Sequence, residues 1–485
     1  MAVWAVPAAV MGALGLWGLN RAMWWDETTT YEVATRSAPD IWALVHHADV
    51  VHVLYYLLMH LLLPAGSGDA VLLRLPSVLG MAVAAGATAA VGRRLAGRAV
   101  GLGAGLLLAV TPLASHYAQE GRSYGLVTGL VTVACLLLLR AVERPTVRRW
   151  VAYGSVVLLA SLLHLFAALI LAAHGFALAA GRIPRRTLHG WLITALAVAA
   201  CLSPFALYAH TQIGQLSLLP RPGWRQAAGL IRQFSGPRLP AVAVVVPLAA
   251  LGALRSRRGK GPLTLRTLAV PWLVLPAGVL LAGSLIQPAF NPRYVLYSLP
   301  ALSLLTAAGP DGLARAAVRP RRGGPPVRGR RLVPRVVGAA LAGVLLVLQW
   351  PTQEWLRTPA SRNDDQTAVA RVIGQRARTE DAIVFVPGTK RNVEYVYAAD
   401  FTRTDDVLMT RSPAASRTLG GEEAPVAEIR RLLLPHRRVW LVDRTVRPGG
   451  SAATVAKREV LLDAYRPTTE ITARGEVITL YVRGS

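Results

Sequence analysis

The chain has 485 residues, of which 53% are hydrophobic and only 16% are charged, and this balance excludes an ordinary soluble protein. The net charge of +27 would suit a nucleic-acid-binding protein. However, the arginines gather in short loops between apolar runs, and no basic domain with interleaved aromatic residues accompanies them. The distribution therefore argues against nucleic-acid binding and is typical of the cytoplasmic loops of a multi-pass membrane protein. The two cysteines, Cys135 and Cys201, lie in apolar segments and indicate neither a disulfide framework nor a thiolate metal site.

Repeated apolar runs of about 20 residues, long enough to cross a bilayer, predict a polytopic α-helical membrane protein with about eleven transmembrane helices. The first helix is expected at residues 4–20, as a retained segment without a basic n-region. An acidic external loop follows at 21–69, in which the apolar stretch 50–64 is short for a crossing and predicts an interfacial or re-entrant helix. The other helices are expected at 70–92, 99–114, 125–142, 150–181 (two short helices hinged near His164), 188–208, 239–254, 267–286, 294–309 and 333–350.

The arginine-rich loops predict how these helices are oriented. If the N-terminus is cytoplasmic, the loops near 93–98, 140–149, 182–186, 255–260 and 315–335 all fall on the cytoplasmic side, as the positive-inside rule requires. The loop 210–238 breaks this rule, because it is external and contains Arg221, Arg225, Arg232 and Arg238. Two interpretations of that loop stay open: an amphipathic helix on anionic lipid headgroups, or a clamp for an anionic substrate.

The composition changes from about residue 351 onwards. Short β-type runs at 382–386, 438–443 and 477–482 alternate with helical patterns at 367–378, 426–434 and 452–464, which predicts a small α/β domain. We therefore expect a transmembrane domain at 1–350, which includes the external first loop at 21–69, and an extracytoplasmic α/β domain at 351–485.

Polar residues that suit chemistry occur in four segments predicted on the external face. Ionisable groups at membrane depth are costly and usually face a cavity or one another. We expect Asp26 to act as a catalytic base in a pocket that it shares with the guanidinium group of Arg122 or Arg293. The four segments are Asp26-Glu27, the stretch from His46 to Tyr56, the stretch from Ser115 to Tyr124, and the stretch from Gln287 to Tyr294.

Five motifs occur in order between residues 20 and 310: Trp25-Asp26-Glu27, Asp49 to Leu58, Arg74 to Ser77, Gln119 to Tyr124 and Asn291 to Tyr294. The ordered set resembles the bacterial C-type (GT-C) glycosyltransferases of the protein O-mannosyltransferase-like superfamily, which also includes the lipid A aminoarabinose transferases. The resemblance implies an inverting transferase in the cell envelope. It would move a sugar from a polyprenyl-phosphate donor to a hydroxyl group of a glycan, lipid or protein at the outer face of the cytoplasmic membrane. Mannose is the expected sugar and arabinose the main alternative.

This chemistry needs few groups. The departing phosphate is already stable as an anion and requires no general acid, whereas the acceptor hydroxyl requires a base. An arginine can hold the phosphate through two hydrogen bonds. By resemblance, Asp26 is that base, Glu27 orients the acceptor or a divalent metal ion, and the second-loop acid is Glu120. The residues expected to bind donor or acceptor are Asp49, His52, Tyr55, Gln119, Glu120, Arg122, Tyr124, Arg293 and Tyr294, and the possible metal ligands are Asp26, Glu27 and His46.

Simpler interpretations stay open beside these. Asp26 and Glu27 could cap a helix, and Arg293 with Tyr294 could anchor a helix end. His164 is typical of a core histidine in an apolar helix, as is His174. Relatives have His-Pro-Pro-Leu-Tyr-Tyr where this chain has Val51-His52-Val53-Leu54-Tyr55-Tyr56, which puts a role for His52 in doubt. The alternative functions are a transporter or flippase of lipid-linked sugars, and a non-catalytic scaffold.

Overall fold

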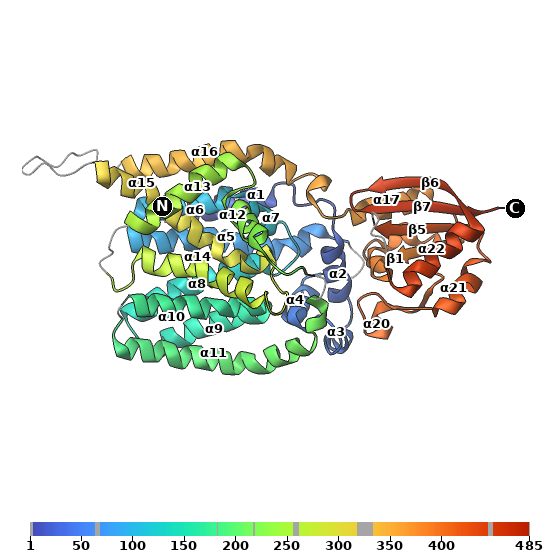
Figure 1. Ribbon diagram of the computed structural model, residues 1–485, viewed down its shortest axis with the longest axis horizontal. Coiled ribbons are helices and arrows are strands. Elements are labelled where there is room, and N and C mark those ends of the chain that lie inside the picture. The colour runs from blue at the N-terminus through green and yellow to red at the C-terminus, as the bar shows by residue number, and fades with distance from the viewer. Residues whose placement is uncertain are drawn as a thin grey trace, which may run out of the picture. The chain divides into compact units, whose positions relative to one another are not determined.

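The computed structural model describes residues 3–63, 68–181, 183–216, 219–255, 261–317, 333–444 and 450–484 (Figure 1). The pattern of contacts divides the chain into two units. The helical unit comprises Met1–Gly18 and Arg74–Glu354, and the α/β unit comprises Leu19–Leu73 and Trp355–Ser485. The predicted domain boundary at residue 350 groups the first loop with the transmembrane helices, whereas its contacts group it with the C-terminal residues.

The helical unit follows the predicted apolar segments closely. Residues 125–142 lie in α8, residues 239–254 lie in α13, and the predicted hinge near His164 is a real break between two helices. The elements are α1 (Ala5–Leu16), α5 (Ala70–Ala96), α6 (Arg98–Val110), α7 (Pro112–Ala118), α8 (Tyr124–Glu143), α9 (Val147–Leu163), η2 (Leu165–Leu169), α10 (Ile170–Ala180), α11 (Arg185–Thr211), η3 (Ile213–Leu216), α12 (Trp224–Ser235), α13 (Leu239–Arg255), α14 (Leu265–Gly283), η4 (Pro292–Ser298), α15 (Leu299–Ala317) and α16 (Val333–Trp355).

The predicted count of eleven membrane-crossing helices is not confirmed. Among the described residues, four helices (α5, α8, α11 and α14) are long and apolar enough to cross, and six spans result if the bent pairs α6–α7 and α12–α13 each count as one. The polytopic helical fold is thus confirmed, but the count of eleven is not. Parts of three predicted cytoplasmic loops, at 182, 256–260 and 318–332, lie outside the described residues.

Helices α5 and α8 pack in close contact because glycine lines their contact face. A Cβ atom at Gly80 would lie 2.5 Å from the carbonyl oxygen of Gly125, and one at Gly129 would lie 2.5 Å from the carbonyl oxygen of Gly80. Small residues allow membrane helices to approach each other this closely. In addition, the Ser77 hydroxyl donates to the carbonyl oxygen of Arg122 at 2.8 Å. Helix α5 therefore fixes the start of α8, where several predicted site residues lie.

The α/β unit confirms the predicted alternation of strands and helices. A sheet of order β2-β1-β5-β7-β6 has β1 parallel to β2 and β5, and β7 antiparallel to β5 and β6. The C-terminal elements are η6 (Pro359–Ser361), α17 (Gln366–Arg376), β1 (Asp381–Val386), η7 (Gly388–Arg391), α18 (Asn392–Val396), α19 (Ala398–Phe401), β2 (Thr404–Asp405), β3 (Met409–Arg411), α20 (Pro413–Ser416), β4 (Glu422–Glu423), α21 (Val426–Leu433), β5 (Arg438–Arg444), α22 (Ala452–Ala464), β6 (Tyr465–Ala473) and β7 (Glu476–Arg483).

Helices cover both faces of this sheet (Figure 1). Ile373 of α17 and Val393 of α18 pack with Phe385 on one face. Leu433 of α21 and Leu461 of α22 pack in a second apolar core on the other face. Strand β1, which has a parallel neighbour on each side, is buried along its whole length, as its continuous apolar run predicts for a parallel strand. The first loop adds four short helices to the same unit: α2 (Trp25–Ala34), α3 (Ala38–Val45), η1 (Val50–His52) and α4 (Val53–His60).

Candidate functional site

Two adjacent acids occupy the first turn of α2, and the structure gives them different surroundings. Glu27 is fully buried, its carboxylate accepts a hydrogen bond from the backbone N–H of Trp24 at 3.4 Å, and the Arg362 guanidinium lies 3.9 Å away. Asp26 keeps part of its surface exposed. A carboxylate at this position is stabilised by the free N–H groups of the helix N-terminus. Glu27 therefore fits the capping interpretation, and Asp26 is the more exposed of the two acids.

The second predicted segment is a compact turn around Asp49. The Tyr56 hydroxyl donates to the Asp49 carboxylate at 2.8 Å, and the ring of His52 packs edge-on against Tyr56 at 6.0 Å. Asp49 has a φ of 59°, in the left-handed region that short polar residues tolerate best after glycine. Tyr55 is buried beside this turn. These contacts give the segment a fixed shape, with the carboxylate of Asp49 held by a tyrosine of the next helix.

The possible metal ligands do not gather into a recognisable metal site. His46 is exposed, and its Nδ1 atom lies 2.7 Å from the carbonyl oxygen of Trp42. Glu27 is engaged with Arg362 and Trp24, as described above. Within the described ranges, no group of three or more histidine, cysteine, aspartate or glutamate side chains could hold a metal ion. We therefore derive no step that passes through a metal.

In the helical unit, cationic and aromatic side chains from three separate segments come together. The guanidinium carbon of Arg293 lies 5.5 Å from the ring centre of Tyr124 and 5.7 Å from that of Tyr294. The His164 ring lies 5.5 Å from the Tyr124 ring and 5.1 Å from the Tyr294 ring. Arg122 and Arg293 both act electrostatically on His164. We name Arg122, Tyr124, His164, Arg293 and Tyr294 the arginine–tyrosine cluster.

The local fold explains why these segments meet. Arg293 and Tyr294 open the 3₁₀ helix η4, where the Asn291 side chain accepts a hydrogen bond from the backbone N–H of Arg293 at 3.2 Å. Further along η4, the Tyr297 hydroxyl donates to the carbonyl oxygen of Phe166 at 2.7 Å, which ties η4 to η2 directly after His164. The close α5–α8 packing places Arg122 and Tyr124 at the start of α8. The predicted segments 115–124 and 287–294 are thus neighbours in space.

Gln119 and Glu120, in the same segment as Arg122, have different surroundings. Gln119 is fully buried, and its side-chain amide donates to the carbonyl oxygens of Gly15 at 2.9 Å and Trp17 at 2.6 Å. Since the last carbonyl groups of a helix lack partners within it, this contact completes the end of α1. Glu120 is buried, with a carboxylate oxygen 4.0 Å from Nε2 of His116. The contacts of Gln119 indicate a structural role, whereas Glu120 is a buried acid two residues before Arg122 of the cluster.

His164 is the residue that sequence reasoning undervalued. His174 is a satisfied core histidine, because its ring nitrogens contact the Tyr153 hydroxyl at 2.9 Å and the Cys135 sulfur at 3.2 Å. His164 is also buried, but its Nε2 atom has no hydrogen-bond partner in the described part of the chain. Burying an unpaired polar atom is unfavourable, so such an atom is typical of a site that binds a ligand. Its position at a predicted hinge between two short helices was the signal available in the sequence.

We also predicted that Asp26 shares a pocket with Arg122 or Arg293. Asp26 belongs to the α/β unit and the two arginines belong to the helical unit, so this pocket stays a prediction.

Comparison with known proteins gives two kinds of match. Residues 48–208 match the family model described as dolichyl-phosphate-mannose-protein mannosyltransferase. The crystal structure of ArnT from Cupriavidus metallidurans in the apo state is 14% identical, covers 98% of this chain and 97% of that chain, and gives a TM-score of 0.57. The structure of the same protein bound to undecaprenyl phosphate is also 14% identical with the same coverage, at a TM-score of 0.55. No curated protein sequence matches significantly.

At 14% identity, the ArnT structures show a shared fold over nearly the full length of both chains. The family model independently matches the sequence from the second to the seventh predicted helix and across the loops that join them. The resemblance predicted from the ordered motifs is therefore confirmed: the protein is a multi-pass membrane protein with the fold of the C-type polyprenyl-phosphate-sugar glycosyltransferases.

Proposed function

We propose that the protein is an inverting glycosyltransferase that moves a sugar from a polyprenyl-phosphate donor to an acceptor hydroxyl group. The observation that supports this most directly is the arginine–tyrosine cluster, in which the Arg293 guanidinium and an unpaired imidazole nitrogen lie among aromatic rings, within the electrostatic influence of Arg122. Guanidinium groups bind phosphate oxygens strongly, and more strongly where water is largely excluded. ArnT with the same fold has been solved with undecaprenyl phosphate, which supports a lipid phosphate as the ligand of the cluster.

The chemistry follows from the groups available. The acceptor oxygen attacks the anomeric carbon of the sugar from the face opposite the phosphate, and the bond between that carbon and the phosphate oxygen breaks. The bonding electrons leave with the phosphate, whose growing charge Arg122 and Arg293 would stabilise. The acceptor proton passes to Asp26 as general base. A single displacement of this kind inverts the configuration at the anomeric carbon.

The other predicted site residues take supporting parts in this proposal. Tyr124 and Tyr294 hold the Arg293 side chain through cation–π contacts with its guanidinium group. Glu27 orients the first turn of α2 beside Asp26. Asp49, with His52 and Tyr55, would contact the acceptor or the sugar. Mannose is the proposed sugar, with arabinose as the alternative, and the acceptor is a hydroxyl group of a glycan, a lipid or a protein.

The orientation of the helices completes the proposal. With the arginine-rich loops in the cytoplasm, Asp26, the arginine–tyrosine cluster and the C-terminal α/β unit belong to the outer face of the cytoplasmic membrane. A polyprenyl-phosphate sugar supplies its own activation, which suits a compartment without nucleotide sugars.

Transfer from a labelled donor tests this function. Membrane vesicles that contain the protein would receive polyprenyl-phosphate [¹⁴C]mannose or the arabinose analogue, and label would be followed in the lipid donor and in acceptor fractions. A transferase moves the label to a new covalent product with inverted anomeric configuration. Movement of intact labelled donor across the bilayer without a new product would instead support the transporter alternative and overturn the proposal.

A further inference from the structure

Helix α2, which carries Asp26, is poorly suited to stand alone. It has only ten residues and includes the run Thr28-Thr29-Thr30, whose β-branched side chains are unfavourable in helices. Isolated helices shorter than about 12–15 residues are marginal in water even with good helix formers. Yet every residue of α2 from Glu27 onwards is buried, and most of these residues are polar. The conformation of α2 must therefore come from the residues packed around it.

The N-terminal end of α2 is hydrogen-bonded to the segment that enters the C-terminal sheet. The backbone N–H of Trp25 donates to the Asp364 carboxylate at 2.8 Å. The backbone N–H of Gln366 donates to the carbonyl oxygen of Met23 at 3.0 Å, and the backbone N–H of Met23 donates to the Thr367 hydroxyl at 3.1 Å. These bonds join residues more than 300 positions apart in the chain. They fix the backbone on both sides of Trp24, directly before Asp26.

The side chain of Trp25 reaches the carboxyl edge of the sheet. Its ring N–H donates to the carbonyl oxygen of Thr389, just after β1, at 3.3 Å. The Arg444 guanidinium, at the end of β5, lies 5.4 Å from the Trp25 ring centre. Along the middle of α2, the Asn392 side-chain amide donates to the Thr29 hydroxyl at 3.0 Å, with both groups buried. In parallel sheets this edge is where ligands usually bind; here it carries a helix of the same chain.

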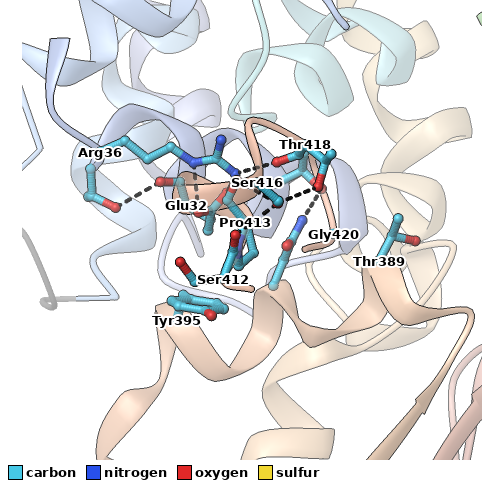
Figure 2. A network of polar contacts seen from close by, with 12 residues as sticks. Glu32, Arg36, Thr389, Tyr395, Ser412, Pro413, Ser416, Thr418 and Gly420 are labelled. Atoms are coloured by element: carbon cyan, nitrogen blue, oxygen red, sulfur yellow. Dashed lines mark hydrogen bonds and ion pairs between the residues drawn. The ribbon is translucent and has the colours of Figure 1, made fainter. Parts of the chain in front are cut away.

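The C-terminal end of α2 is held by a buried ion pair. Arg36 donates from Nε to Glu32 Oε1 at 2.8 Å and from Nη2 to Glu32 Oε2 at 2.7 Å, and both side chains are almost completely buried. Nη2 also donates to the carbonyl oxygen of Thr418 at 2.9 Å (Figure 2). Burying two charges costs several kcal/mol per ion, which only good geometry and extra hydrogen bonds offset. The bond to Thr418 is such an extra hydrogen bond.

The loop that presents the Thr418 carbonyl group is itself ordered by the C-terminal domain. The Ser416 and Thr418 hydroxyls lie 2.9 Å apart, and Ser412 caps the short helix α20 (Figure 2). Arg391 donates to the carbonyl oxygen of Gly420 and forms ion pairs with Asp406 and Glu423, both at 2.7 Å. The carbonyl group that accepts the hydrogen bond from Arg36 is thus part of a partly buried network of polar contacts that reaches Arg391, just after β1.

From these contacts we infer that the C-terminal α/β domain is the scaffold that positions the catalytic helix, and that Arg36 is a positioning residue that acts on Asp26 through α2. The inference deepens the proposed function and rests on it. Both ends and the middle of α2 are fixed by residues 364–367, 389–392 and 418, so the domain sets where the Asp26 carboxylate lies. Small displacements of a catalytic group, of about 1 Å, can reduce the rate about 100-fold.

The double variant Glu32→Gln/Arg36→Met tests this role. It removes both buried charges together, so no ion is left without a partner, and methionine cannot donate to Thr418. We expect kcat to fall roughly 10- to 100-fold while the KM for the donor lipid stays within about two-fold. Amide hydrogen exchange in α2 should become faster by at least about ten-fold. The single variant Arg36→Lys, which keeps a donor and the charge, should recover part of kcat.

The matched control is Asp381→Asn/Arg438→Met. Arg438 and Asp381 form a comparable two-contact pair in the same unit, at 2.7 and 3.1 Å, but between β1 and β5 and without contact to α2. The control should lower the melting temperature as much as the test variant and leave kcat within about two-fold of wild type. Wild-type kcat and unchanged exchange in the test variant would overturn the inference, as would an equal loss of kcat in the control. A wild-type protein without transferase activity would overturn the proposed function instead, and exchange in α2 would still decide the positioning role.

Discussion

Replacing Asp26 by asparagine should stop sugar transfer and leave the fold intact. A positioned general base is worth about 10²–10⁴ in rate, and each factor of ten is 1.36 kcal/mol, so the activation free energy should rise by about 3–5 kcal/mol. Asp26 is partly exposed, and the favourable interaction of its charge with the helix N-terminus amounts to only about 0.3–1 kcal/mol. The free energy of unfolding should therefore change little.

The neighbouring Glu27 should show the opposite behaviour. Its carboxylate is fully buried, receives the Trp24 backbone N–H at 3.4 Å and lies 3.9 Å from the Arg362 guanidinium. Glu27→Gln removes the charge from this buried contact, which should lower the free energy of unfolding by about 1–3 kcal/mol. The rate per folded molecule should fall much less than in Asp26→Asn, because the glutamine keeps the shape of the first turn.

Two measurements on the same purified protein in detergent separate these outcomes. Single-turnover transfer from a labelled donor lipid gives the rate, and thermal unfolding gives the stability. Asp40→Asn is the matched control, since Asp40 is also partly exposed and lies in the first turn of α3. The reasoning is refuted if Asp26→Asn turns over at the wild-type rate, or if Glu27→Gln loses the rate without losing stability.

Three further predictions concern the rest of the chain. Arg293→Lys keeps the charge but loses the planar group that contacts the Tyr124 ring. In calorimetric titration, undecaprenyl phosphate should therefore bind about ten-fold more weakly to this variant than to the wild type. An unchanged affinity would contradict the interpretation of the cluster as a phosphate site. Gly125→Val would place a Cβ atom 2.7 Å from the Ser77 carbonyl oxygen and force α5 and α8 apart. The free energy of unfolding should therefore fall by about 1–3 kcal/mol or more. An unchanged melting temperature would contradict the close packing of these two helices. Burial, with the charge of Asp406 adding to it, raises the pKa of the Glu394 carboxyl from 4.5 to about 7. Because the folded state then binds this proton more tightly than the unfolded chain, its contribution is complete below pH 4.5 and is lost as the pH rises through 7. Chemical unfolding should show this loss of up to about 3 kcal/mol, and Glu394→Gln should remove the part of the pH slope that this carboxyl contributes.

The membrane helices and the C-terminal α/β fold could be predicted because each depends on local pattern. Run length and charge distribution located α8 and α13, and the polar hinge at His164 separated α9 from α10. Alternation of short apolar runs with helical periodicity located the strands β1, β5 and β7. Run length alone does not determine the number of crossings, because the sequence does not show whether a bent pair such as α12–α13, with 89° between its helices, is one span or two.

For the candidate site, the sequence predicted which residues take part but not how their side chains are arranged. Asp26 and Glu27 are neighbours with the same chemistry, but successive side chains on a helix point about 100° apart, so one meets the interior and the other does not. His164 and His174 likewise read as equivalent histidines in apolar helices. They differ because Tyr153 and Cys135 contact the ring nitrogens of His174, whereas the His164 ring lies against Tyr124 and Tyr294 and its Nε2 atom has no hydrogen-bond partner among the described residues.

By itself, the sequence determined that this is a polytopic membrane protein with an α/β domain at its C-terminal end, because hydrophobic length and periodicity act over a few residues at a time. Only the tertiary structure decided that the Arg36 guanidinium donates a hydrogen bond to the carbonyl oxygen of Thr418, and that Arg122, His164 and Arg293 belong to one cluster. Such contacts join residues separated by up to several hundred positions, and they depend on how whole helices and sheets pack. No local pattern in the chain specifies that packing.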